Sequence, residues 1–493
     1  MKRASMVTLG LATIPLCGYG QPADNERPNL LVVMADQFRG DALGFLEREG
    51  VFTPNLDRFS KSAVVLDEAI SSYPVSSPAR AMFLTGMYPH NNGVITNCES
   101  NSALRNVELK QEAVCWSDVL KAEGYATAYI GKWHLDKPLK PYVDCANNKG
   151  KIAWNEWCPP ARRHGFDYWV AYGTYDFHLR PLYWNTEASR EEFYYVDQWG
   201  PEYEADLAIR FIDSVSTSKQ PFAMMVSMNP PHTPYHLVPE RYKRLYADIN
   251  RDSLAANTPE LKGLIKAKIE EHKKDIANYY ACISGVDDQF GRIVAALESR
   301  GLRENTVVVF VSDHGDLVSL HEGRLPNIEY RNKNIFYEES MRIPFMISYP
   351  AKLKPRVDSE LLISIEDFYP SVLSLMGLRE RIPASVQSRD LSAQIMGSAE
   401  EGPSFQLYMR YMNIRGGNPR TGMRGVRTAR YTYAVATVDG VPTEEFLYDR
   451  ETDPHQLHNI AYSRKAKQTV KELRGIMEQR LREIGDPCAG IAF

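Results

Sequence analysis

The chain lacks a charge excess of either sign, a long apolar run, internal repeats and any low-complexity tract. Its 493 residues include 58 Lys and Arg against 62 Asp and Glu, a formal net charge of −4. This balance argues against a nucleic-acid-binding protein, which usually presents a strongly basic face. An anionic small substrate stays open, because it needs only a local positive site. With 44% hydrophobic and 24% charged residues, the composition excludes the disordered, collagen-like and disulfide-scaffold classes.

No segment is long and apolar enough to anchor the chain in a membrane, and residues 1–20 read instead as a secretory signal peptide. Lys2 and Arg3 precede an apolar stretch at 6–16, and small residues up to Gly20 offer a cleavage point. We therefore expect a periplasmic or otherwise exported protein without a transmembrane segment.

Cysteines are few, and none of the 7 forms a CxxC pair or a thiol–imidazole metal pattern. Cys17 leaves lipoprotein anchoring as an alternative, although Leu16 is bulky where lipid-attachment sites favour a small residue. An exported chain permits disulfides, and a Cys145–Cys158 bond would close one local loop. Buried free thiols are the alternative that the sequence leaves open.

Short apolar runs predict the buried strands of a central sheet. They lie at residues 30–35, 126–130, 222–227, 306–312 and 345–348. Helical patterns lie between them, such as 117–122 and 275–300, and each of these two is closed by a glycine. Strands that are apolar throughout and alternate with helices predict an α/β fold, with a large, mostly parallel central sheet flanked by helices.

The pattern changes near residue 383. Beyond it come shorter polar–apolar alternations, as at 425–436, and an amphipathic helix at 464–484. We therefore predict a catalytic α/β domain at 27–383 and a smaller C-terminal α+β subdomain at 384–493, which carries an antiparallel sheet.

Polar side chains, most of them ionisable, follow four of the predicted strands. They are Asp36 and Gln37, Lys132 and His134, His232, and Asp313 and His314. An aspartate after a strand is more often a helix cap than a metal ligand, but ligands of open α/β sheets bind at the carboxyl ends of the strands, where these four sets should meet. Carboxylate and amide oxygens suit a hard cation such as Ca²⁺. The imidazole keeps Mn²⁺ or another transition ion open.

The segment 76–86 predicts a helix whose first turn contains Pro78, with Ser76 just outside it. Such a helix end aims backbone N–H groups and positive dipole at an anion. Arg80 lies about one turn further on and can fold back to the same place. A capped helix with a surface arginine is the plain alternative.

The pattern Ser76-x-Pro78-x-Arg80, followed by Leu84-Thr85-Gly86, closely resembles the signature of the formylglycine-dependent sulfatases of the alkaline-phosphatase superfamily. In that family a separate maturation enzyme oxidises the first residue, Cys or Ser, to formylglycine (3-oxoalanine). A serine start resembles the form that oxygen-independent radical enzymes of bacteria mature. Further segments resemble family landmarks in the same order: Pro28-Asn29, Tyr88-Pro89-His90, Gly131-Lys132-Trp133-His134, Arg163-His164-Gly165-Phe166, Asp313-His314-Gly315-Asp316, Tyr337-Glu338-Glu339-Ser340 and Leu447-Tyr448-Asp449.

The resemblance implies an alkaline-phosphatase-like fold and a metal site. Asp36, Gln37, Asp313 and His314 would hold the metal, most often Ca²⁺, together with the hydrated aldehyde of Ser76. Many relatives carry Asp where Gln37 stands and Asn where His314 stands, which leaves the identity of the metal open.

The resemblance also implies catalytic roles. Arg80 and Lys132 would orient the nucleophile, and Lys132 and Lys333 would reach the sulfate. His134 would act on a hydroxyl of the hydrate, and His232 would contact the sulfate and protonate the leaving oxygen. Positive charge at these places stabilises the charge that builds on the sulfate oxygens. An unconverted serine has no second hydroxyl and would stall after one turnover.

Substrate contacts are predicted from composition. The segment 176–184 is rich in polar and aromatic groups that suit a sugar, although an ordinary aromatic loop fits as well. The predicted contacts in this segment are Asp176, His178 and Arg180. The stretch 321–333 is longer than is usual in the family between the metal Asp-His pair and the lysine, so His321, Arg324 and Arg331 are further predicted contacts. In the C-terminal part, Arg415, Arg420 and Arg424 either lean over the cleft and read an acidic sugar or are solvated surface charges.

The sequence therefore predicts an exported sulfatase that acts on a sulfated carbohydrate and meets a radical-type maturation enzyme transiently. One alternative is the same scaffold acting on choline sulfate or on a phosphonate or phosphate ester. Another is a non-enzymatic glycan-binding relative, against which the intact catalytic set argues.

Overall fold

The computed structural model describes residues 27–218, 220–250, 266–318, 333–411 and 418–491. The predicted signal peptide at 1–20, with Cys17, lies outside these ranges. In the part that is described, no helix has the length and apolarity to cross a membrane.

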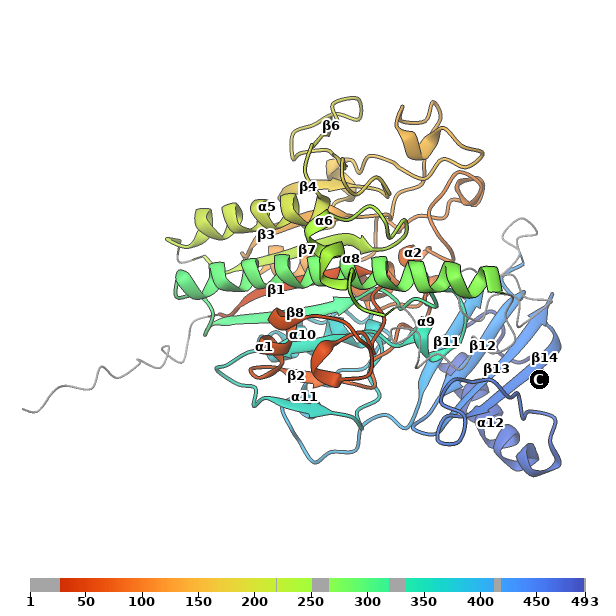
Figure 1. Cartoon of the computed structure of the whole chain (residues 1–493). Coiled ribbons are helices and arrows are strands. Elements are labelled where there is room, and N and C mark those ends of the chain that lie inside the picture. The colour runs from red at the N-terminus through yellow and green to blue at the C-terminus, as the bar shows by residue number, and fades with distance from the viewer. Residues whose placement is uncertain (1–26, 219, 251–265, 319–332, 412–417, 492–493) are drawn as a thin grey trace, which may run out of the picture.

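The central sheet has eight strands in the order β10-β2-β9-β8-β1-β7-β3-β4 (Figure 1). Their bounds are β1 Asn29–Asp36, β2 Val64–Leu66, β3 Ala126–Lys132, β4 Tyr168–Tyr172, β7 Phe222–Pro231, β8 Thr306–Ser312, β9 Phe345–Ser348 and β10 Arg356–Asp358. Only β9 runs antiparallel to its neighbours, so the predicted large and mostly parallel sheet is confirmed.

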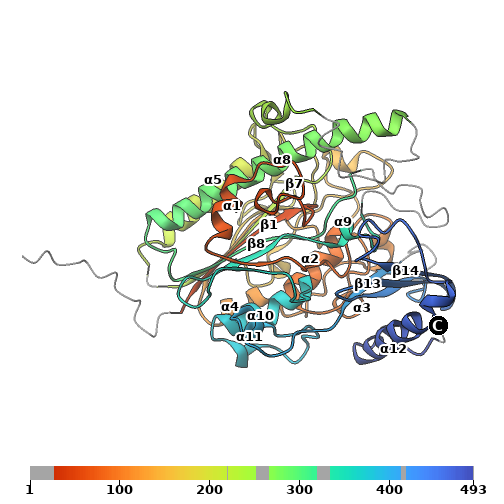
Figure 2. The same ribbon diagram turned by 60° about the horizontal axis from the view of Figure 1, so that its bottom comes forward.

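Two hydrophobic cores cover the two faces of this sheet. Successive residues of a strand point to opposite faces: Leu31 and Val33 of β1 enter one core, and Leu30 and Val32 enter the other. Figure 2 shows helices on both sides of the sheet. One face carries α1 Pro54–Ser60, α5 Gly200–Val215 and α8 Lys266–Ser299, and the other carries α2 Ser76–Thr85, α4 Trp116–Ala122, α10 Phe368–Leu375 and α11 Ser392–Ile395.

The remaining helices and strands of this part are short. They are α3 Pro89–Asn92, α6 Glu240–Lys243, α9 Glu338–Met341 and the two-stranded sheet of β5 Leu182–Tyr183 and β6 Tyr194–Tyr195.

The C-terminal part forms a four-stranded antiparallel sheet with one long helix, as the sequence predicts. The elements are β11 Gln406–Tyr411, β12 Gly422–Arg427, β13 Tyr431–Val438, β14 Val441–Asp449 and α12 Lys467–Glu483. The rings of Tyr408, Phe446 and Tyr448 on this sheet lie 5.8, 5.0 and 5.8 Å from that of Phe336. The two parts therefore share a core cluster, and the division at residues 383 and 384 stays a prediction.

All six cysteines outside the N-terminal segment are buried free thiols. The structure thus has the free-thiol alternative at Cys145 and Cys158, and not the local disulfide.

Candidate active site

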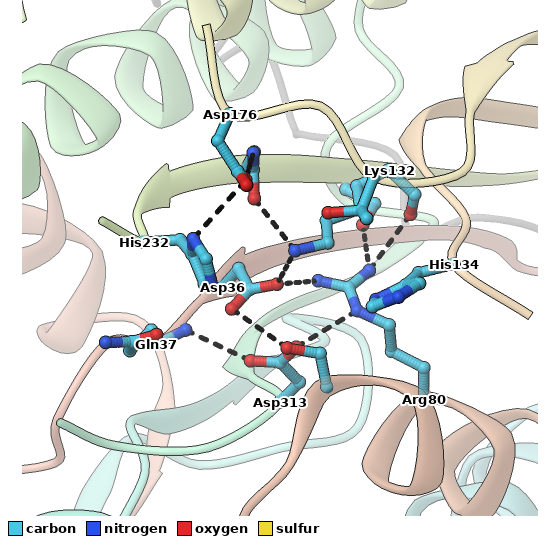
Figure 3. A network of polar contacts seen from close by, with 12 residues as sticks. Asp36, Gln37, Arg80, Lys132, His134, Asp176, His232 and Asp313 are labelled. Atoms are coloured by element: carbon cyan, nitrogen blue, oxygen red, sulfur yellow. Dashed lines mark hydrogen bonds and ion pairs between the residues drawn. The ribbon is translucent and has the colours of Figure 1, made fainter. Parts of the chain in front are cut away.

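The carboxyl ends of four neighbouring strands bring their polar side chains to one place, as the strand-end pattern predicts. Asp36 ends β1, Lys132 ends β3, His232 directly follows β7, and Asp313 follows β8. Figure 3 shows these side chains pointing toward one another, with Arg80 of α2 between them.

Ser76 is the first residue of α2, so the prediction that it lies just outside the helix is wrong by one position. Pro78 is the third helical residue. It removes no helical hydrogen bond there, because the first amides of a helix have no partner within it. The Ser76 hydroxyl is buried, 3.1 Å from Nε2 of His314 and 3.4 Å from Oδ1 of Asp36. The helix start therefore delivers this hydroxyl to the strand ends.

Asp36, Asp313 and His314 form a fully buried group that can hold a divalent cation. One ligand atom of each lies within 4.8 Å of the other two. The Nδ1 atom of His314 lies 2.8 Å from the Gly315 carbonyl oxygen and must donate to it, so the lone pair of Nε2 faces the group. Two carboxylates and one imidazole nitrogen thus converge at one buried point.

Gln37 turns its amide oxygen toward this group. Its Nε2 donates to Oδ2 of Asp316 at 2.7 Å, while its Oε1 accepts from Nζ of Lys333 at 2.9 Å. The Lys333 ammonium also lies 3.4 Å from the Ser76 hydroxyl and 3.3 Å from Nε2 of His314. All the predicted metal ligands and the second predicted sulfate lysine are therefore side by side.

Arg80 clamps the two carboxylates together. Its Nε donates to Oδ2 of Asp313 and one terminal nitrogen donates to Oδ2 of Asp36, both at 3.0 Å. The other terminal nitrogen donates to the Lys132 carbonyl oxygen at 2.9 Å and to the Ser227 hydroxyl at 2.6 Å. Arg80 is 1% exposed, so the alternative of a surface arginine is wrong.

Lys132 adds a second cation. Its Nζ lies 2.7 Å from Oδ2 of Asp36 and donates to Oδ1 of Asn229 at 2.9 Å. The preceding residue, Gly131, allows β3 to lie close to β7. Its φ is +104°, and a Cβ there would lie 2.2 Å from the Ser227 carbonyl oxygen.

The charges set the protonation of the carboxylates. Burial alone would raise the pKa of Asp36, but Lys132, His232, Arg80 and Lys333 together hold it well below its usual value. Burial and the neighbouring Asp36 charge raise the pKa of Asp313 to about 6. Asp36 is thus the firmly ionised carboxylate of the pair.

His134 points into the site without a hydrogen-bond partner. It is 3% exposed, and neither ring nitrogen bonds to any residue in the described ranges. Burial, Lys132 and Arg80 hold its pKa well below the usual value, so the ring is neutral near pH 7 and can accept a proton.

His232 lies on the outer side of the cluster. Its Nδ1 donates to the Thr233 carbonyl oxygen at 2.8 Å, and Oδ1 of Asp176 lies 3.5 Å from the same nitrogen. His178, buried beside it, donates through Nε2 to the His232 carbonyl oxygen at 2.9 Å. Asp176 and His178 were predicted as sugar contacts, and the structure places both against His232.

Among the residues that the structure describes, the other predicted substrate contacts do not join the cluster. Arg180 is exposed, pairs with Asp197 at 2.8 Å and lies over the Tyr195 ring. Arg424 is fully buried against Asp486, so both expectations for it, a contact with an acidic sugar and a solvated surface charge, are wrong. Arg420 is exposed. His321, Arg324, Arg331 and Arg415 lie outside the described residues.

Sequence reasoning missed two residues that hold the site together. Asn229 joins Lys132 to Asp176, since its Nδ2 lies 3.3 Å from Oδ1 of Asp176. Asp316 orients Gln37. Asp316 closes the segment Asp313-His314-Gly315-Asp316, and Asn229 lies three residues before His232, but only the folded geometry shows what they bind.

Comparisons with known proteins agree with this geometry. Residues 28–378 match the family profile described as Sulfatase, and residues 327–483 match the one described as the C-terminal part of N-sulphoglucosamine sulphohydrolase. The chain is 36% identical to the endo-4-O-sulfatase of Bacteroides thetaiotaomicron, over 94% of this chain and 93% of that protein. It is 32% identical to the ulvan-active sulfatase of Formosa agariphila, over 94% of this chain and 83% of that protein.

The fold has a near counterpart among solved structures. The crystal structure of a Bacteroides fragilis protein assigned as the sulfatase yidJ superposes with a TM-score of 0.90 at 49% sequence identity. The match covers 97% of this chain and 100% of that one.

Proposed function

The chain belongs to the sulfatase family of sulfuric ester hydrolases, and on that premise we propose that it removes sulfate from a sulfated carbohydrate through a formylglycine at Ser76. The observation that carries this proposal is the position of the Ser76 hydroxyl, 3.1 Å from Nε2 of His314 at the start of α2 and beside the buried carboxylates. If Ser76 is converted, the hydrated aldehyde would supply two hydroxyls at this position, one as the nucleophile and one whose deprotonation would allow the sulfate to leave.

The donor set fits a divalent cation. Asp36, Asp313 and Gln37 offer oxygens, and His314 offers one nitrogen whose lone pair faces them. We propose Ca²⁺, because oxygen donors predominate; the imidazole also admits Mn²⁺. A bound cation draws negative charge from the sulfate oxygens and so lowers the barrier to attack.

The chain's own residues supply the other steps. Arg80 fixes Asp36 and Asp313, and Lys132 and Lys333 bring positive charge to where the sulfate oxygens gather negative charge. His134, neutral and unpartnered among the described residues, accepts a proton from a hydroxyl at position 76. His232 gives a proton to the leaving alcohol.

The substrate class rests on the relatives. The name of one states a sulfate position and that of the other a polysaccharide: an endo-4-O-sulfatase and an ulvan-active sulfatase. We therefore propose a sulfated polysaccharide or its oligosaccharides as the substrate. Export by a signal peptide at 1–20 and conversion of Ser76 by a radical-type maturation enzyme complete the proposal.

The test is sulfate release from a panel of sugars that each carry one sulfate at a defined position, 4-O-sulfates included. The Ser76→Cys variant is produced in a host that matures cysteine-type sulfatases, and conversion is verified by peptide mass. Ser76→Ala, with the same fold and no oxidisable side chain, is the control. We expect release from one class of sugar and none from Ser76→Ala.

Choline sulfate, a phosphonate monoester and a phosphate ester belong to the same panel. Faster turnover of any of these than of every sulfated sugar, by a fully converted protein, would contradict the proposed substrate.

A further inference from the structure

The Asp176 carboxylate is contacted by two amide donors of the protein and by the ring of His232. Nδ2 of Asn147 lies 3.2 Å from its Oδ2, and Nδ2 of Asn229 lies 3.3 Å from its Oδ1. The same Oδ1 lies 3.5 Å from Nδ1 of His232. The carboxylate side chain is 33% exposed and that of His232 is 17% exposed, so the pair is partly shielded from solvent.

The ring of His232 is held with one nitrogen toward the protein and one toward the site. Nδ1 faces Thr233 and Asp176, while Nε2 bonds to no residue that the structure describes. His178 and Asn229 fix the backbone, the first by donating to the His232 carbonyl oxygen and the second by accepting from the His232 amide at 3.0 Å. Nε2 is therefore the atom that can pass a proton to a ligand.

The surrounding charges make that proton hard to keep. Burial, Lys333 and Lys132 hold the pKa of His232 well below its usual value, whereas Asp36 and the Thr233 carbonyl oppose them. Within the described ranges, Asp176 is the carboxylate at ion-pair distance from the ring. An acid whose proton is repelled by two lysine charges is helped by a counter-charge at its other ring nitrogen to be protonated when the substrate arrives.

We propose that Asp176 is a positioning residue for His232, which orients the imidazole and supports its protonated form as the acid for the leaving alcohol. This inference rests on the proposed sulfatase function. As an oxygen at position 76 bonds to sulfur, the electron pair of the breaking S–O bond goes to the alcohol oxygen. That oxygen takes the proton from Nε2, and the ring is left neutral and regains a proton from water.

Asp176 could bind the sugar or could support the acid His232, and activity on sugar sulfates alone does not distinguish these two roles. Loss of a sugar contact slows only substrates that contain the sugar, whereas loss of support for the acid slows every substrate with a poor leaving group. The test therefore uses simple aryl and alkyl sulfates without a sugar ring, from acidic phenols to ordinary alcohols, with fully converted protein. A better leaving group needs less help from an acid, so the slope of log kcat/KM against the leaving-group pKa reports the proton transfer.

We expect Asp176→Asn to leave the phenol sulfates almost unchanged and to slow the alcohol sulfates by about 10-fold or more, within the roughly 10²–10⁴-fold that a general acid supplies. The slope becomes steeper, and the high-pH limb of kcat/KM shifts to lower pH. The groups that face His232 and contribute to this limb are Lys132, Lys333, Asp36, Asp176 and His178.

Asp197→Asn is the matched control, since its side chain is 86% exposed and pairs with Arg180 away from the cluster. In a His232→Gln background, Asp176→Asn should cause no further loss. Asn147→Ala, which loosens Asp176 without removing its charge, should move the slope in the same direction if Asp176→Asn folds poorly.

An unchanged slope with a raised KM for sugar sulfates would overturn the inference and return Asp176 to the sugar contacts. An equal loss in the presence and absence of His232 would overturn it as well. If the wild-type converted protein hydrolyses no sulfate ester, the proposed function fails instead, and the two failures are thereby distinguished.

Discussion

The amide of Gln37 donates from Nε2 to Oδ2 of Asp316 at 2.7 Å, and this contact decides which end of the amide faces the buried carboxylates. Asp316 is itself anchored, because the Tyr235 hydroxyl donates to the same oxygen at 2.5 Å and the Val318 amide donates to Oδ1 at 2.8 Å. Asp316 thus fixes the carbonyl oxygen of Gln37 on the side of the buried carboxylates, where the proposed cation would bind.

Asp316→Asn should weaken binding of the divalent cation by roughly 10- to 100-fold, the usual cost of losing a group that orients a ligand. The substituted amide can donate where the carboxylate only accepts, so Gln37 is free to turn. Calorimetric titration of chelator-treated protein with Ca²⁺ and with Mn²⁺ measures the effect.

Asp287→Asn is the control for this titration. Asp287 of α8 is also a buried carboxylate, and it accepts from the backbone amides of Asn55 and Leu56 in α1 rather than from residues of the strand-end cluster. If Asp316→Asn and Asp287→Asn bind the cation with equal affinity, cation binding does not require a fixed orientation of Gln37.

Arg80→Met should destabilise the fold, and more so without a divalent cation than with one. Asp36 keeps Lys132 as a partner, but Asp313 loses the one arginine that contacts it within the described ranges. Breaking a buried pair from one side costs about 3–5 kcal/mol. Denaturant unfolding in chelator and in saturating Ca²⁺ measures both conditions.

A bound cation replaces part of the lost charge, so Ca²⁺ should recover some of the stability of Arg80→Met. Identical losses in chelator and in Ca²⁺ would indicate that the cation does not bind between Asp36 and Asp313.

Glu204 predicts a specific pH dependence of stability. It is fully buried on α5, where it accepts from the hydroxyls of Tyr183 at 2.9 Å and Tyr172 at 3.4 Å, and burial raises its pKa to about 8. The folded state therefore holds this proton more tightly than the unfolded chain, whose value is near 4.5. Stability from this group is complete below about pH 4.5 and is lost as the pH rises through about 8.

Glu204→Gln should remove this part of the pH dependence. The difference in the free energy of unfolding between Glu204→Gln and the wild type should therefore be a few kcal/mol more favourable to the variant at pH 9 than at pH 5. Denaturant unfolding at both pH values checks this, with the exposed Glu187→Gln as control. Wild type and Glu204→Gln curves that change in parallel would contradict the assignment.

The strands of the sheet could be predicted from the sequence where they are buried on both faces. The run at 306–312 and the run at 345–348 coincide with β8 and β9, because a strand covered on both sides is apolar throughout. The three-residue strands β2 Val64–Leu66 and β10 Arg356–Asp358 were not predicted. They are too short for a periodic signal and exist through their pairing with neighbours distant in sequence.

The sequence predicted the site residues that directly follow strands, but it did not predict the residues that orient them. Asp36, Lys132 and Asp313 follow apolar runs, and the shared edge of a parallel sheet brings them together. The composition of the segment 176–184 suggested that Asp176 contacts a sugar, but composition does not show which way a side chain points. Only the folded chain shows that the Asp176 carboxylate turns back to Asn147 and His232.

The central claim is that turnover depends on conversion of Ser76. The most direct measurement produces the wild-type chain with and without an oxygen-independent maturation enzyme, determines the converted fraction of the Ser76 peptide by mass, and follows steady-state sulfate release from the same samples. The account predicts that the rate is proportional to the converted fraction and that unconverted protein does not turn over. Sustained sulfate release by protein whose Ser76 peptide carries only the unmodified serine mass would contradict it.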